Sequence, residues 1–300
     1  MRITQNMISN NVLSNLSKNY SQLAQYQDEL ASGQRVTKPS DDPVAASLGI
    51  GYRSDYSRAA QYQKNVAAAQ KWMSASDSAL SQAGSVLDEI SDLTLSANNS
   101  TQTSDELNAD ATQIDQLTQQ LVTIGNTQIG GQYIFSGADS ENPLLTQTTD
   151  ASGNTAVSVN ATALANPDLS MTVNDGVQIS VNVNPKNVFT SNMFADLSSL
   201  KTALQSGDQA TVNDSISKIA SYKEAFTNAE ADIGAREQRV NLMTDQLNAQ
   251  QTNAVNALST SQGADYAKTV VSLNQQQNVF QASLAAGARI IQQSLVNYLQ

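Results

Sequence analysis

The chain of 300 residues contains no cysteine and no histidine. Their absence excludes disulfides, thiolate nucleophiles, histidine proton shuttles and most transition-metal sites. Aromatic residues make up only 5% of the chain and charged residues 14%. Small side chains such as alanine, serine and threonine take their place, and they suit long, closely packed helices better than a thick core of large residues.

Positive charge is also scarce, since 16 Lys and Arg face 27 Asp and Glu and the formal net charge is −11. Phosphates repel an acidic chain, so no nucleic-acid partner is expected. No run of 18 apolar residues is present, and no transmembrane helix is expected. The first 30 residues lack the apolar segment of a secretory signal peptide, so no signal cleavage is expected.

The N-terminal part is predicted to form two helices. Apolar side chains recur at steps of three and four residues up to Leu30, as in the a/d seam of a coiled coil. Gly33 follows, the usual residue just past a helix end. Ser40-Asp41-Asp42-Pro43 then predicts a second helix, because a carboxylate caps free N–H groups and proline fits the first helical position. The apolar pattern continues for about 55 residues.

The middle of the chain is predicted to change from helix to strand. A third helix is expected from a cap at Ser104 or Asp105 to about Gly125. The run Gly130–Gly137 predicts a short strand bounded by glycines. From residue 141 to residue 189 the apolar period becomes two, and Asp175-Gly176 supplies a turn. We therefore expect a small β domain inserted at the far ends of the long helices.

The C-terminal part returns to helical period. A helix is expected from about Phe194 to Gly207, and a long one from near Asp208 to a break at Ser261-Gln262-Gly263. The last helix is expected from about Ala264 to the end. The order of the expected elements is thus nearly the same from either end of the chain, and the simplest fold pairs the two ends.

The sequence predicts a mainly α fold, an elongated helical rod with paired N- and C-terminal helices and a small inserted β domain. Residues 1–42 and 262–300 would form a terminal helical layer, residues 43–140 and 190–261 the long-helix rod, and residues 141–189 the β domain. A two-helix layer buries little surface. We therefore expect the terminal layer to be loose in the free subunit and to become ordered on assembly.

Apolar side chains on the terminal helices are the strongest functional signal, because exposed apolar stripes mark interfaces. The candidate assembly residues are Leu13, Leu16, Leu23, Leu30, Val270, Leu273, Phe280, Leu284, Ile291 and Leu295.

No catalytic, cofactor-binding or metal-binding residue is expected. Ser198 with Lys201, and Ser215 with Lys218, match the S-x-x-K spacing of some acylating enzymes, but their partner motifs are absent. A Ser–Lys hydrolase is the alternative from another class.

Several motifs carry a family resemblance. They are the opening Met1-Arg2-Ile3-Thr4 and the runs 30–36, 38–43, 131–137, 231–236, 280–284 and 294–299. Together they resemble the bacterial flagellin family, most closely its branch of hook–filament junction proteins. The likeness covers roughly residues 1–140 and 190–300, and the middle of the chain shows no match.

The resemblance implies a flagellin-like structural subunit that joins the flagellar hook to the filament and is not an enzyme. Implied partners are the first hook-associated protein, flagellin, copies of the chain in a ring, and a cytosolic export chaperone on the C-terminal helix. The location implied is the extracellular flagellum, reached through the flagellar type III system without signal cleavage. A flagellin that forms the filament itself is the alternative within the family.

Overall fold

The computed structural model describes residues 5–99, 102–149, 155–165 and 169–298, with only the backbone at residues 5, 6, 8, 149, 155 and 290–298. The chain divides into two compact units. Unit 1 comprises residues 1–58 and 249–300, and unit 2 comprises residues 59–248. The three-part division expected from the sequence stays a prediction.

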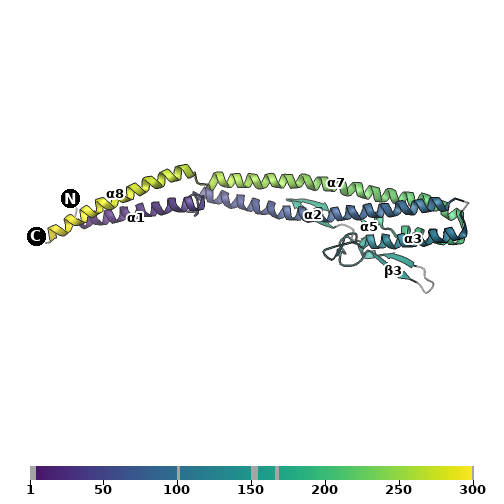
Figure 1. The fold of residues 1–300 in the computed structure, drawn as a ribbon. Helices are drawn as coiled ribbons and strands as arrows, with labels where there is room; N and C mark the ends of the chain where they lie inside the picture. The colour runs from purple at the N-terminus through teal and green to yellow at the C-terminus, as the bar shows by residue number, and fades with distance from the viewer. Residues whose placement is uncertain (1–4, 100–101, 150–154, 166–168, 299–300) are drawn as a thin grey trace. The chain divides into compact units, whose positions relative to one another are not determined.

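Unit 1 is built on the two ends of the chain. Helix α1 (Gln5–Ser32) and helix α8 (Tyr266–Tyr298) lie side by side and antiparallel (Figure 1). Asn19 near the middle of α1 hydrogen-bonds Ser283 of α8, and Tyr20 contacts Phe280. The predicted pairing of the terminal helices is confirmed.

Two long helices run through both units. Helix α2 (Pro43–Ala97) has 55 residues and helix α7 (Gln209–Gln262) has 54, as their unbroken apolar periods predict. Within unit 2 they are antiparallel partners. Gln63 of α2 donates to Asn248 of α7 at 2.5 Å, and further along Gln70 donates to Asn241 at 2.6 Å.

Unit 2 adds helix α3 (Ser104–Gly125) and helix α6 (Ser191–Ser206), which pack against each other. The N-cap of α3 is Thr103, which precedes both predicted caps. Its side chain accepts from the Glu106 N–H while the Glu106 carboxylate accepts from the Thr103 N–H, a reciprocal capping box. The caps expected from the sequence, Ser104 or Asp105, were therefore wrong by one or two positions, because Thr103 has the glutamate three residues later.

The core of unit 2 is one continuous apolar cluster that includes residues of its helices and of its strands. Its largest fully buried side chains come from α2, α3, the part of the chain between α3 and α6, and α6 itself. They are Met73, Leu80, Leu87, Ile90, Ile114, Leu121, Ile134, Phe135, Leu144, Leu145, Phe189 and Met193. Two T-shaped contacts link Phe135 to Phe189 and Phe189 to Phe226.

The strands form three separate hairpins in the described part of the chain. They pair β1 (Gln128–Ile129) with β2 (Gln132–Tyr133), β3 (Leu145–Thr149) with β4 (Thr155–Val159), and β5 (Ser170–Asn174) with β6 (Val177–Ser180). The short helix α4 (Ala161–Ala165) lies between the second and third hairpins, and the short helix α5 (Pro185–Val188) follows the third. The strand expected over Gly130–Gly137 is limited to two residues, because Gly130 and Gly131 form the β1–β2 turn at positive φ.

The β5–β6 hairpin lies beside the long helices, so the expectation that the whole β domain sits at their far ends was wrong. Asn65 of α2 donates to the Thr172 carbonyl of β5 at 2.8 Å. Arg236 of α7 donates to the carbonyls of Ser180 and Asn182 at 3.2 and 3.1 Å. Both anchors lie far from the end of α2 and the start of α7. The β3–β4 hairpin packs on α3 and α6.

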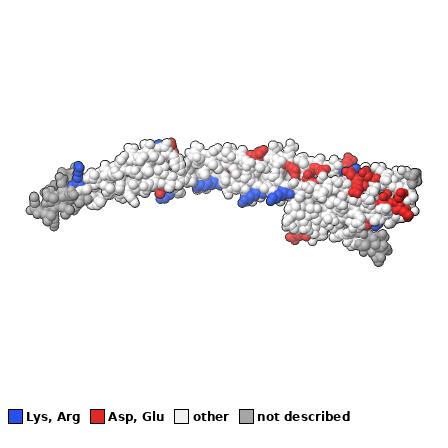
Figure 2. All heavy atoms as spheres, in the orientation of Figure 1, with Lys and Arg blue, Asp and Glu red and all other residues white. Residues whose placement is uncertain are grey.

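Charge is distributed unequally between the units. Unit 1 has eight basic and six acidic side chains, a formal charge of +2, whereas unit 2 has eight basic and 21 acidic ones, a charge of −13. No Lys or Arg occurs from residue 72 to residue 185. Figure 2 shows Asp and Glu gathered where α2 ends and α3 and α7 begin. None of the described helices is long and apolar enough to cross a membrane.

Candidate assembly interface

The paired helices α1 and α8 present their predicted assembly residues at two levels of exposure. Leu16, Leu23, Leu30, Leu273 and Phe280 are half-buried. Leu13, Val270 and Leu284 remain 53%, 43% and 45% exposed. Ile291 and Leu295 lie near the end of α8, outside the described side chains. Their role in assembly stays a prediction, but a single helix pair leaves much of this apolar surface uncovered.

Further exposed apolar side chains extend the same surface and were absent from the predicted set. Met7 and Tyr20 on α1, and Val271 and Val279 on α8, are all more than 40% exposed. Val271 directly follows Val270, so the two point in different directions around the helix and the apolar surface of α8 is wider than one seam. Adjacent apolar residues outside the a/d positions were the signal that could have identified them.

The buried residues of this pair are few and mostly polar. In the described parts of α1 and α8 only Glu29, Thr269 and Gly287 are buried. Gly287 lets the helices approach, because a Cβ there would lie 3.1 Å from Val12 Cγ1. A full burial of one leucine is worth about 1.5–3 kcal/mol, and no described leucine of the pair achieves it. The pair is therefore weakly held by its own packing.

A joint within unit 1 connects the breaks that precede and follow the long helices. The chain leaves α1 at Gly33, whose φ of +69° favours glycine. Gln34 then forms an antiparallel bridge with Gly263, directly after α7. The Ala264 N–H donates to the Gly33 carbonyl at 2.9 Å, and the Arg35 N–H donates to the Gln262 carbonyl at 2.7 Å. The two breaks predicted separately from the sequence thus form one structure.

The side chain of Gln262 secures this joint and is only 3% exposed. Its Nε2 donates to the Ala45 carbonyl at 3.0 Å, and its Oε1 accepts from Arg53 at 2.6 Å. Burying a polar group without partners is costly, but here both ends of the carboxamide are hydrogen-bonded. Gly49 makes room for it. Sequence reasoning missed Gln262 because a glutamine next to a glycine was interpreted as a helix break alone.

The linker between α1 and α2 is ordered by its two aspartates. Asp42 accepts from the Ala45 N–H at 3.0 Å, which is the predicted cap of α2. Asp41 instead folds back and accepts from the Lys38 N–H at 2.9 Å. These backbone hydrogen bonds hold the pKa of both carboxyls below the ordinary aspartate value. The pair serves local structure, as expected, and does not converge on a substrate.

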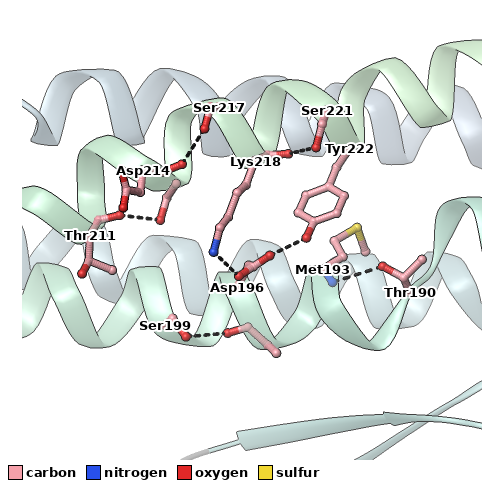
Figure 3. A network of polar contacts seen from close by, with 12 residues as sticks. Thr190, Met193, Asp196, Ser199, Thr211, Asp214, Ser217, Lys218, Ser221 and Tyr222 are labelled. Carbon is pink, nitrogen blue, oxygen red and sulfur yellow. Dashed lines mark hydrogen bonds and ion pairs between the residues drawn. The ribbon is translucent and has the colours of Figure 1, made fainter.

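The two S-x-x-K sequences do not form a nucleophile and base. Lys201 lies 2.8 Å from the Asp115 carboxylate, and Lys218 lies 2.7 Å from Asp196 (Figure 3). The hydrogen bond to Asp196 raises the pKa of Lys218. A general base must be neutral, so a lysine held as a charged donor cannot serve as one. Both lysines join helices by ion pairs.

Asp196 is the centre of a contact between α6 and α7. Lys218 donates to one carboxylate oxygen and the Tyr222 hydroxyl donates to the other (Figure 3). Partial burial raises the pKa of Asp196, but these two donors outweigh it and the net pKa is lowered. Burial and the neighbouring carboxylate raise the pKa of Tyr222. The network positions helices, and the described residues contain no group of His, Cys, Asp and Glu suited to a metal.

Comparison with known families agrees with this architecture. The model of the bacterial flagellin N-terminal helical region matches residues 3–140, and that of the C-terminal helical region matches residues 216–299. The chain belongs to the bacterial flagellin family. The matched ranges include α1 to α3, most of α7 and all of α8. This family consists of structural flagellar proteins, so the chain is a structural protein and not an enzyme.

Individual relatives include hook-associated proteins and a flagellin. The chain is 27% identical over 142 residues to flagellar hook-associated protein 3 of Escherichia coli (strain K12), covering 47% of the chain and 45% of the relative. It is 23% identical over 139 residues to a flagellin of Clostridium tyrobutyricum, covering 46% and 37%. The chain therefore spans less than half the length of the curated relatives it matches.

Solved structures show the same fold. FlgL of Bacillus cereus aligns with a TM-score of 0.57 and 23% identity, covering 70% of this chain and 99% of that one. The flagellar junction protein FlgL of Legionella pneumophila aligns with a TM-score of 0.58 and 13% identity, covering 72% and 100%. The predicted mainly α, flagellin-like fold is confirmed.

Proposed function

We propose that this flagellin-family chain is a structural subunit of the bacterial flagellum at the junction of hook and filament. The names of its relatives support this location, since hook-associated protein 3 and FlgL junction proteins recur among them. No reaction is involved. The work of such a subunit is to present complementary surfaces to its neighbours on both sides.

The observation that carries the proposal is the uncovered apolar surface of α1 and α8. At least eight apolar side chains of the described pair are more than 40% exposed, from Met7 to Leu284. Apolar patches on this scale mark interaction sites. Assembly would bury them and stabilise a pair that its own packing holds weakly. We therefore propose that the pair is loose in the free subunit and becomes ordered between neighbours.

The partners follow from that location. Copies of the chain would form a ring, with the first hook-associated protein on one side and flagellin on the other. A cytosolic export chaperone would cover α8 before assembly, because an exposed apolar helix aggregates unless it is shielded. Export through the flagellar type III system, without signal cleavage, would place the subunit outside the cell.

Removing the gene tests this function. Cells that lack it should assemble hooks without filaments and release flagellin into the medium, and a plasmid copy should restore filaments. Electron microscopy of the cells and an immunoblot of the medium measure both outcomes. Filaments of normal length and number in the deletion strain would contradict the proposal.

The filament subunit itself is the second candidate, favoured by the likeness to a flagellin. A filament subunit would polymerise without limit, whereas a junction subunit would stop at a ring. Purified protein seeded with short filament fragments distinguishes them. Long fibres made of this chain would support the flagellin alternative, and a failure to elongate seeds would support the junction.

A further inference from the structure

Apolar packing alone does not fix the register of α1 against α8. Leu16, Leu23 and Leu30 on α1 repeat at intervals of seven residues. A shift of α8 by one heptad would therefore bring similar apolar side chains into contact, and no described leucine is fully buried in either helix. Repetitive, thin seams specify register poorly unless a polar contact breaks the repeat.

Asn19 supplies such a contact. Its Nδ2 donates to the Ser283 hydroxyl at 3.0 Å. Gln276 Nε2 donates to the Asn19 carbonyl at 3.2 Å and to its Oδ1 at 3.4 Å. Ser283 and Gln276 lie seven residues apart on one face of α8, so Asn19 lies between them. In the described parts of the pair, every side-chain hydrogen bond between α1 and α8 involves Asn19.

We infer that Asn19, together with Gln276 and Ser283, sets the register of α1 against α8 and thereby decides which apolar side chains the pair presents to its neighbours. A heptad shift in one direction would replace Ser283 with Ile290, which has no hydrogen-bonding group. A shift in the other direction would replace Gln276 with Thr269, whose shorter side chain does not reach as far. Either shift leaves the half-buried Asn19 carboxamide with one well-matched partner position on α8 in place of two, so the observed register is favoured.

The remaining contacts agree with this single register. Tyr20 contacts Phe280 with ring centroids 6.0 Å apart, and Val12 lies against Gly287. Toward the joint, Gly33 lies against Tyr266. Each step along α1 is matched by a step back along α8. A shift by one heptad would place Phe280, in place of Gly287, against Val12.

The consequence for assembly rests on the proposed function, but the register itself can be measured on the purified full-length protein. The chain has no native cysteine, so any disulfide that forms must join the introduced cysteines. Val12→Cys with Gly287→Cys reports the observed register, because a Cβ at 287 would lie 3.1 Å from Val12 Cγ1. Val12→Cys with Phe280→Cys reports a shift of one heptad.

Dilute protein is oxidised and the two intramolecular disulfides are quantified. The parent should form the 12–287 disulfide in large excess over the 12–280 disulfide. Asn19→Leu should lower that ratio by roughly tenfold, while circular dichroism shows that helix content is kept. Gln276→Leu, on the other helix, should act in the same direction. Asn15→Leu is the matched control, the same change at an exposed position of α1, and should leave the ratio unchanged.

Three results would overturn the inference. They are an unchanged ratio in both Asn19→Leu and Gln276→Leu, an equal fall in Asn15→Leu, and no 12–287 disulfide in the parent. None of these results depends on filaments or flagellar partners. A failed register test therefore leaves the junction role standing, and a failed deletion test leaves the register assignment standing.

Discussion

Gln262 occupies the space that a side chain at Gly49 would need. A Cβ added to Gly49 would lie 2.0 Å from Gln262 Nε2 and 2.4 Å from its Cδ. The glutamine cannot move aside without losing its hydrogen bonds to Ala45 and Arg53. Gly49 on α2 and the buried Gln262 amide at the end of α7 therefore depend on each other.

The Gly49→Ala variant should be less stable by about 1–3 kcal/mol, because the methyl group displaces Gln262 and its buried carboxamide loses its partners. Gly51→Ala is the matched control on the same helix, where an added Cβ meets nothing within 4 Å. That change should be neutral or stabilise by roughly 0.5–1 kcal/mol. Urea unfolding followed by circular dichroism measures both, and equal midpoints would contradict the role of Gln262.

Removing the N-cap of α3 should also lower the stability of unit 2. Thr103→Ala abolishes the reciprocal capping box with Glu106 and should destabilise unit 2 by about 0.5–2 kcal/mol. Thr112→Ala, an exposed threonine inside the same helix, should change stability by less than about 0.5 kcal/mol. Thermal melting compares the two, and the assignment fails if the Thr112 variant is the less stable one.

The Asp196 network predicts losses of stability at both ends of the pH scale. The folded pKa of Asp196 is lowered, so its contribution is complete above the ordinary value of 3.8 and is lost as pH falls below it. The folded pKa of Tyr222 is raised, so its contribution is complete below 10.0 and is lost as pH rises further.

Asp196→Asn should therefore flatten the acid side of the stability profile, and Tyr222→Phe should flatten part of the alkaline side. Unfolding free energies measured in urea between pH 2 and pH 11 provide the comparison. Identical pH profiles for parent and Asp196→Asn would show that this carboxylate does not stabilise the α6–α7 contact.

The charge of unit 2 predicts that association of copies strengthens with moderate salt. Units with a formal charge of −13 repel each other, and the screening length falls from about 30 Å at 0.01 M salt to about 8 Å at 0.15 M. Sedimentation velocity across that range should show more self-association at the higher concentration. A steady loss of association with added salt would indicate that attraction between opposite charges dominates.

Sequence periodicity was sufficient to predict the helices, because the residues that determine them are close together in the chain. The heptad seams, Gly33 at positive φ, Pro43 at the start of α2 and Gly207 after α6 each depend on a few neighbouring residues. The family motifs added the correct branch of relatives.

Long-range features were not predictable in the same way. The β5–β6 hairpin is held by contacts such as Arg236 to Ser180, between residues far apart in the chain, so its position beside the long helices was missed. The buried amide of Gln262 depends on Gly49 more than 200 residues earlier. Which leucines of α1 and α8 stay exposed depends on how each helix is rotated about its axis, and the seam alone does not fix that rotation.

We propose that the exposed apolar residues of the terminal pair carry assembly. Leu284→Asp tests it, because Leu284 is 45% exposed and a carboxylate there should hardly affect the free subunit. Leu242→Asp is the control, the same change at a leucine of unit 2 that is 64% exposed. Thermal melting should confirm that both variants stay folded.

The measurement is the fraction of hooks that carry a filament when each variant replaces the parent gene, counted by electron microscopy. Leu284→Asp should leave hooks bare while its melting curve matches the parent, and Leu242→Asp should support filaments as the parent does. Filaments on a normal fraction of hooks in the Leu284→Asp strain would contradict the proposed role of the terminal pair.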